Sequence, residues 1–130
     1  MKPERNSDKT FEDYLEAMLM LKEKNGYVRS IDVATQLEVT KPSVTYTTKR
    51  LKERGYITMD QDNLIYITDE GMKIATKIYN RHKMLSKFFM DLGVDETTAL
   101  EDACKIEHDI SETTFDALCK YVEKHTPKQK

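Results

Sequence analysis

The segment from Ser30 to Gly55 carries two short helical patterns separated by only three residues. The first covers 31–37, with apolar residues at 31, 33, 34 and 37, and Ser30 is expected to act as its N-cap. Glu38-Val39-Thr40 separates it from a second pattern, which opens on Lys41-Pro42 and stops at Gly55. Proline is tolerated in the first turn of a helix and glycine commonly follows the last. This spacing predicts a helix-turn-helix.

A change of period follows directly after Gly55. Residues 56–59 and 64–67 are rich in β-branched and aromatic residues, and four polar residues that favour turns, 60–63, separate them. This arrangement predicts a short hairpin. A hairpin after a helix-turn-helix is the layout of the winged helix-turn-helix, a DNA-binding motif.

The rest of the chain is helical in pattern. Apolar residues at helical spacing predict one helix from about Asp8–Thr10 to Asn25-Gly26 and another from Thr68 or Asp69 to Leu92. Asp95 and Ser111 are expected to cap two more helices, which end at about 109 and 124. With 38% hydrophobic residues, 4 Gly and 3 Pro in 130 residues, the chain is a helix-rich globule. The fold class is therefore mainly α, with a winged helix-turn-helix domain over 1–72 and an all-helical domain over 73–130.

Positive charge is concentrated on the second helix of the helix-turn-helix. The whole chain has a formal net charge of −2, whereas 41–56 holds five basic residues and one acid. DNA phosphates require such a patch, and short polar side chains at the start of the helix can read base edges. The candidate DNA-binding residues are Thr40, Lys41, Pro42, Ser43, Thr45, Tyr46, Lys49 and Arg50, with Thr47 as a further candidate for base reading. The alternative is that a basic helix is only a solvated face. The acidic Asp60 and Asp62 make the hairpin a weaker candidate for DNA contact.

A second constellation consists of metal-ligand side chains on three helices. Cys104, Glu107 and His108 have i, i+3, i+4 spacing, which places a thiolate, a carboxylate and an imidazole on one helical face. Three further residues are candidates on the other two helices: Asp13, Glu16 and His82. The alternatives remain a buried cysteine, acids favoured by the helix dipole and a core histidine. Spacing alone does not show that the three helices meet.

Three segments, 39–45, 81–85 and 104–111, together resemble the metal-dependent transcriptional repressors related to the diphtheria toxin repressor and the manganese transport regulator. The resemblance covers about 8–122. It implies a winged-helix domain, a helical dimerisation domain, metal ions bound between them and repression of metal-uptake genes. The ligands that it implies are Asp13, Glu16, His82, Cys104, Glu107 and His108, and the implied metal is Mn(II) or Fe(II).

The sequence departs from each branch of that family in places. Asp13 is the residue type that the manganese branch carries at this position, whereas Cys104 is the one that the iron branch carries. Ser86 and Leu100 stand where the iron branch carries the acid and the histidine of an ancillary site, which we therefore expect to be missing. The chain is also expected to lack the third, SH3-like domain of longer members.

The resulting hypothesis is a homodimeric, metal-activated repressor that binds double-stranded operator DNA. Because the longest apolar run has five residues and no signal peptide is visible, we expect a cytoplasmic protein without membrane contact. Two cysteines form neither a disulfide framework nor a zinc knuckle, which fits a reducing compartment. The first rival is a metal-independent winged-helix regulator that senses a small organic ligand. The second is a small metalloenzyme, which we disfavour because no substrate pocket or general base can be argued; we expect no small-molecule substrate.

Overall fold

The computed structural model describes residues 3–125, with side chains from residue 9 onward. The chain divides into two compact units, Met1–Lys77 and Ile78–Lys130. The division falls inside helix α4 (Asp69–Asp91). The sequence-based domain boundary between 72 and 73 lies in the same helix and stays a prediction.

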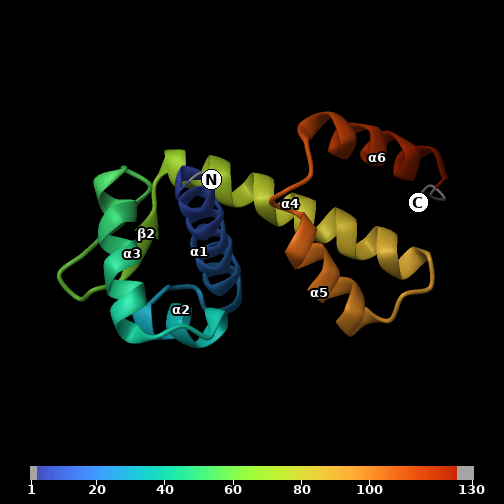
Figure 1. Ribbon diagram of the computed structural model, residues 1–130. Coiled ribbons are helices and arrows are strands. Elements are labelled where there is room, and N and C mark those ends of the chain that lie inside the picture. Colours follow the sequence, from blue (N-terminus) through green and yellow to red (C-terminus); the bar gives the residue numbers. More distant parts are fainter. Residues whose placement is uncertain (1–2, 126–130) are drawn as a thin grey trace. The chain divides into compact units, whose positions relative to one another are not determined.

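The first unit contains the helix-turn-helix and the hairpin (Figure 1). Its elements are α1 (Pro3–Asn25), α2 (Ser30–Leu37), α3 (Lys41–Glu53), β1 (Ile57–Met59), β2 (Ile65–Ile67) and the start of α4. Helix α1 begins earlier than its apolar pattern suggested. The winged helix-turn-helix that the sequence predicted is confirmed.

The core of the first unit is built from α1, α2 and α3, with α2 in contact with both of the other helices. Leu15 and Met18 of α1 are fully buried, as are Val33 of α2 and Leu51 of α3. Each such side chain contributes about 1.5–3 kcal/mol when it leaves water. These contacts fix α3 by its apolar face and leave its polar face outward.

The turn between α2 and α3 is closed by main-chain and side-chain caps. Glu38 ends α2 in the left-handed region, with φ of 57°, and the Val39 N–H donates to the Ala34 carbonyl at 3.0 Å. Thr40 begins α3 by accepting the Ser43 N–H on its Oγ1 at 3.2 Å. The predicted role of Ser30 was wrong. Ser30 is the first helical residue, and Arg29, in extended conformation, occupies the cap without a side-chain bond.

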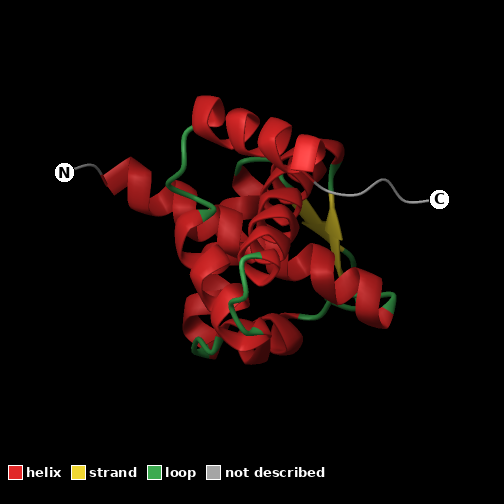
Figure 2. Cartoon of the chain, turned by 90° about the vertical axis from the view of Figure 1, so that its right-hand side faces the viewer, coloured by secondary structure: helices red, strands yellow, loops and turns green. Residues whose placement is uncertain are grey.

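Arg29 is extended because the segment before α2 pairs with the hairpin. Strands β1 and β2 are antiparallel, with Ile57 opposite Ile67. Arg29 forms an isolated antiparallel bridge with Leu64, and the Ile65 N–H donates to the Val28 carbonyl at 2.9 Å. Figure 2 shows the short strands among the helices. The hairpin is confirmed, and its third partner is a feature that strand propensity alone did not indicate.

The second unit consists of the second part of α4 together with α5 (Glu96–Ile106) and α6 (Glu112–His125), which lie on either side of it (Figure 1). Buried residues come from all three helices: Ile78, Leu85, Ala99, Ala103 and Val122. Asp95 and Ser111 cap α5 and α6 as predicted, each accepting a main-chain N–H three residues on. Helix α5 is shorter than predicted and ends at Ile106, so Glu107 and His108 belong to the turn that follows it.

Within residues 3–125, no helix is both long enough and apolar enough to span a membrane.

Candidate DNA-binding surface and metal-binding residues

Helix α3 presents most of the candidate DNA-binding side chains to solvent. Seven of the eight are exposed, and Arg50 is half-buried; the exposed ones are Thr40, Lys41, Pro42, Ser43, Thr45, Tyr46 and Lys49. Thr47, the further candidate for base reading, differs from them. It is only 6% exposed and faces the core beside the anchors Val44 and Leu51. Thr47 lies on the same helical face as those two anchors, so its hydroxyl is unavailable for base contact.

Aromatic rings hold the Arg50 side chain in place. Its guanidinium carbon lies 5.6 Å from the ring centroid of Tyr46 and 5.9 Å from that of Phe11, both within cation–π range. Phe11 is buried in α1, and Arg54 lies over the same ring at 5.3 Å. A restrained guanidinium loses less side-chain entropy when it binds a phosphate or a base. Helix α1 therefore helps to orient two basic residues of the α3 segment.

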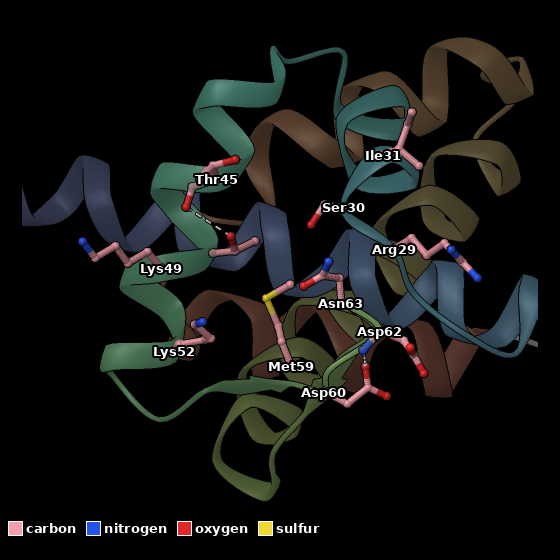
Figure 3. Close-up of a pocket in the computed structure, with 11 residues that line it drawn as sticks. Arg29, Ser30, Ile31, Thr45, Lys49, Lys52, Met59, Asp60, Asp62 and Asn63 are labelled. Atoms are coloured by element: carbon pink, nitrogen blue, oxygen red, sulfur yellow. Dashed lines mark hydrogen bonds between the residues drawn. The ribbon is translucent and has the colours of Figure 1, made fainter.

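A hollow of about 770 Å³ lies between α3, the start of α2 and the hairpin. Figure 3 shows Thr45, Lys49 and Lys52 on α3, with Met59 and Asp60 among the residues of the hairpin. Arg29 also lines the hollow. Arg29 and Lys52 were absent from the candidate set derived from the sequence. The only sequence signal for Arg29 was its position just before a short helix.

The carboxylate of Asp60 is engaged within the hairpin. Its Oδ1 accepts the main-chain N–H of Asp62 at 2.9 Å and that of Leu64 at 3.0 Å, and its Oδ2 accepts the Tyr66 hydroxyl at 3.0 Å. The Leu64 N–H is the largest influence that lowers the pKa of Asp60. The Asp60 side chain therefore stabilises the hairpin turn.

Helix α1 carries Asp13 and Glu16 one turn apart. One carboxylate oxygen of each lies within 4.8 Å of the other. Glu16 is only 6% exposed, and Asp13 is half-buried. Carboxylates that are this poorly solvated require a compensating positive charge or hydrogen bonds. The pair suits a hard divalent cation.

In the second unit, a buried carboxylate lies between two imidazoles. Glu107 Oε1 is 2.9 Å from His82 Nδ1, and Glu107 Oε2 is 3.3 Å from His108 Nε2. The exposed fractions of the side chains are 0% for Glu107, 14% for His82 and 1% for His108. Each oxygen of the Glu107 carboxylate thus lies next to one imidazole nitrogen, in a place from which water is largely excluded. Oxygen and imidazole donors are the ligand types of Mn(II), Fe(II) and Zn(II).

Cys104 differs from Glu107 and His108, the two candidates that follow it in the sequence. It is exposed, whereas Glu107 is fully buried. As a metal ligand, Cys104 stays a prediction.

A residue that the sequence reasoning overlooked lies beside His82. Arg81 is 6% exposed, and its Nη1 donates to the carbonyl oxygens of Glu107 at 3.1 Å and Ile110 at 2.9 Å. Its guanidinium also lies over the Phe115 ring, 5.2 Å from the centroid. Helical spacing contains no signal for a main-chain contact of this kind.

Two family models match the chain in succession. Residues 8–63 match the N-terminal DNA binding domain of iron dependent repressors, and residues 68–129 match their metal binding and dimerisation domain. The chain belongs to the iron dependent repressor family. This confirms the resemblance to the diphtheria toxin repressor and manganese transport regulator group, a class of metal-dependent transcriptional repressors. The rival hypothesis of a metal-independent regulator has no support.

Individual iron dependent repressors and their relatives are similar over most of this chain. An uncharacterised HTH-type transcriptional regulator of Methanocaldococcus jannaschii is 36% identical over 121 residues, covering 92% of this chain and 97% of that protein. The transcriptional regulator MntR of Escherichia coli O157:H7 is 36% identical over 117 residues, covering 90% of this chain and 76% of its own length.

Solved structures of the family extend further than this chain. The metal-dependent transcriptional regulator MtsR superposes with a TM-score of 0.79 at 25% sequence identity. The match covers 87% of this chain and 53% of MtsR, so the chain spans about half the length of that protein. The shared part comprises the winged helix-turn-helix and the helical domain, as the predicted fold class requires.

Proposed function

We propose that this repressor binds double-stranded operator DNA as a homodimer when it is loaded with Mn(II) or Fe(II), and so controls metal-uptake genes. The observation that carries the proposal is the buried carboxylate of Glu107 between the imidazoles of His82 and His108. A buried cluster of this kind is costly in an apolar interior unless it binds a cation or a proton. The match of residues 68–129 to the metal binding and dimerisation domain of iron dependent repressors supports a metal as the cation.

The proposed metal ligands are Asp13, Glu16, His82, Cys104, Glu107 and His108. Their chemistry fits the family's metal, because carboxylates and imidazoles outnumber the single thiol. The carboxylates of Asp13 and Glu16 supply negative charge from α1, and Glu107 supplies it from the turn after α5. When bound, the ion supplies positive charge that neutralises these carboxylates and holds their side chains together.

The residues of the DNA-binding unit carry out recognition. Lys41 and Lys49 are exposed on α3 and contact phosphates, while Thr45 and Tyr46 face the major groove. Arg50, held by the rings of Phe11 and Tyr46, completes the surface. A dimer presents two such helices, so the operator contains two half-sites about one helical turn apart.

Metal and DNA are coupled through the arrangement of the ligands. Asp13 and Glu16 belong to α1, whose Phe11 ring contacts Arg50 and Arg54 at the end of α3. Holding the two carboxylates therefore restricts where the recognition helix can be presented. An ion that binds the DNA-competent arrangement better shifts the population toward it, and DNA must tighten metal binding by the same factor.

The same proposal excludes catalysis and predicts where the protein acts. A repressor needs neither a substrate pocket nor a general base, so we expect no turnover by this chain. Its operator partner places it in the cytoplasm.

Operator binding measured with and without metal tests the proposal. We expect Mn(II) or anaerobic Fe(II) to tighten binding of a labelled operator, identified by selection from random duplexes, relative to protein treated with a chelator. Size-exclusion chromatography with light scattering should report a dimer on the DNA. Equal affinity in chelator and in metal would refute metal activation, and binding to a single half-site by a monomer would refute the dimer.

A further inference from the structure

We infer that Arg81 is a positioning residue for the metal ligands. It would clamp the main chain that carries Glu107 and His108. The inference deepens the proposed function and rests on it, because the ligands are those of the proposed metal site. Arg81 contacts none of the ligand atoms itself and acts through the backbone.

The clamp brackets the ligand segment on both sides. Arg81 Nη1 donates to the carbonyl of Glu107 at 3.1 Å and to that of Ile110 at 2.9 Å, and His108 lies between these two anchors. The last carbonyls of a helix have no partner within the helix, so the end of α5 needs an external donor. Arg81 supplies that donor for the turn in which both ligands stand.

Two consecutive residues of α4 contact two different groups of Glu107. Arg81 binds its carbonyl oxygen, and His82 contacts its carboxylate Oε1 at 2.9 Å. With the main chain and the side chain both fixed to one rigid helix, the carboxylate has little freedom to turn. Outer partners that orient a ligand in this way set metal affinity.

The environment of Arg81 indicates this role. Arg81 is only 6% exposed, so its guanidinium has given up most of its hydration, which is unfavourable unless other contacts compensate. Among residues 3–125, its two hydrogen-bond acceptors are main-chain carbonyls, and its Nε–H is buried without an acceptor. The Phe115 ring, 5.2 Å from the guanidinium carbon, stacks on it from α6. These contacts place the Arg81 side chain where it can donate to main-chain carbonyls.

The test compares Arg81→Met, Arg81→Lys and the control Lys83→Met. Lys83 is an exposed residue two positions along α4, so its replacement removes the same charge without touching the clamp. Isothermal titration should show Mn(II) affinity lowered by about tenfold in Arg81→Met. Arg81→Lys should recover part of it, because an ammonium can reach a carbonyl but lacks the planar fork. Lys83→Met should match the wild type.

Hydrogen exchange of the metal-free proteins gives a second readout that needs no metal. We expect faster exchange at 106–112 in Arg81→Met, with exchange in the DNA-binding unit unchanged. If Arg81→Met loses its helical circular dichroism, Arg81→Lys alone decides, and it must show weaker Mn(II) binding while folded. Unchanged Mn(II) affinity in a folded Arg81 variant, or unchanged exchange at 106–112, would overturn the inference. A wild-type protein that binds no Mn(II) or Fe(II) would instead contradict the proposed function.

Discussion

Nδ1 of His82 lies 2.9 Å from Oε1 of Glu107, although the two residues are 25 positions apart in the chain. Glu107 is fully buried and also lies within 3.3 Å of His108 through its other oxygen. Neutralising this carboxylate is therefore expected to remove the central ligand of the second unit.

Glu107→Gln should lower Mn(II) affinity by at least about tenfold, because removing a residue that only orients a metal ligand already costs about that much. The amide keeps the size of the side chain but loses its charge. Titration calorimetry of the variant against the wild type measures the change, and Glu101→Gln, which replaces an exposed acid on α5, is the control. Equal affinity in both variants would remove Glu107 from the ligand set.

Cys104 can be tested by spectroscopy. If its thiolate is a ligand, Co(II)-loaded protein shows sulfur-to-metal charge-transfer absorption that Cys104→Ser abolishes. We also expect this variant to lose more affinity for Fe(II) than for Mn(II), because thiolates favour the softer ion. Cys119→Ser is the matched control, since that thiol lies on α6 and burial raises its pKa. A spectrum that Cys104→Ser leaves unchanged would exclude the thiolate.

Lys49→Ala should weaken operator binding and reduce the slope of log affinity against log salt by about 1, because one phosphate contact is lost. Lys49 is exposed on α3 beside the hollow. Lys73→Ala removes the same charge from the exposed surface of α4, where Lys73 pairs with Glu70, and should leave the slope unchanged. Fluorescence anisotropy over a salt series measures both, and a smaller slope in the control would point to a general charge effect.

Gly71→Ala should destabilise the first unit by about 1–3 kcal/mol, the range for overpacking. A Cβ at this position would collide with the carbonyl oxygen of Tyr56, which already accepts the Thr68 N–H. Alanine normally stabilises a helix relative to glycine, so the sign is diagnostic. Urea unfolding measures the change in the free energy of unfolding, with Lys73→Ala, an exposed alanine substitution on the same helix, as the control. An increase in the free energy of unfolding of Gly71→Ala would show that the helix start can shift.

Asp60 predicts a pH dependence of the hairpin. Because its folded-state pKa lies below the unfolded value, its contribution is present above about pH 3.9 and is lost as the pH falls through the folded pKa. Thermal unfolding of Asp60→Asn should therefore occur at a lower temperature than in the wild type at pH 7, with the difference shrinking toward pH 3. Asp62→Asn is the control, since Asp62 donates to Asp60 through its main chain. A difference that does not shrink as the pH falls below about 3.9 would contradict the role of the carboxylate.

Helix existence and order could be read from the sequence because they depend on local patterns. Apolar spacing, the Lys41-Pro42 start and Gly55 after α3 predicted the helix-turn-helix, and the two β-prone segments that follow predicted the wing. The basic α3 surface was also predicted, because charge and exposure follow directly from which helical face is apolar. Errors occurred at element ends, as at Ser30 and the end of α5, where contacts from other segments decide the boundary.

The sequence by itself determined which residue types are present for a metal and for DNA, and the helices that carry them. Tertiary structure decided that His82, Glu107 and His108 come together in one buried cluster, and that Arg81 holds the turn after α5. The physical reason is that helical periodicity is a local property of the chain. Contacts between α4 and the end of α5 join residues 25 to 29 positions apart, and no local pattern encodes which carbonyl a buried guanidinium will reach.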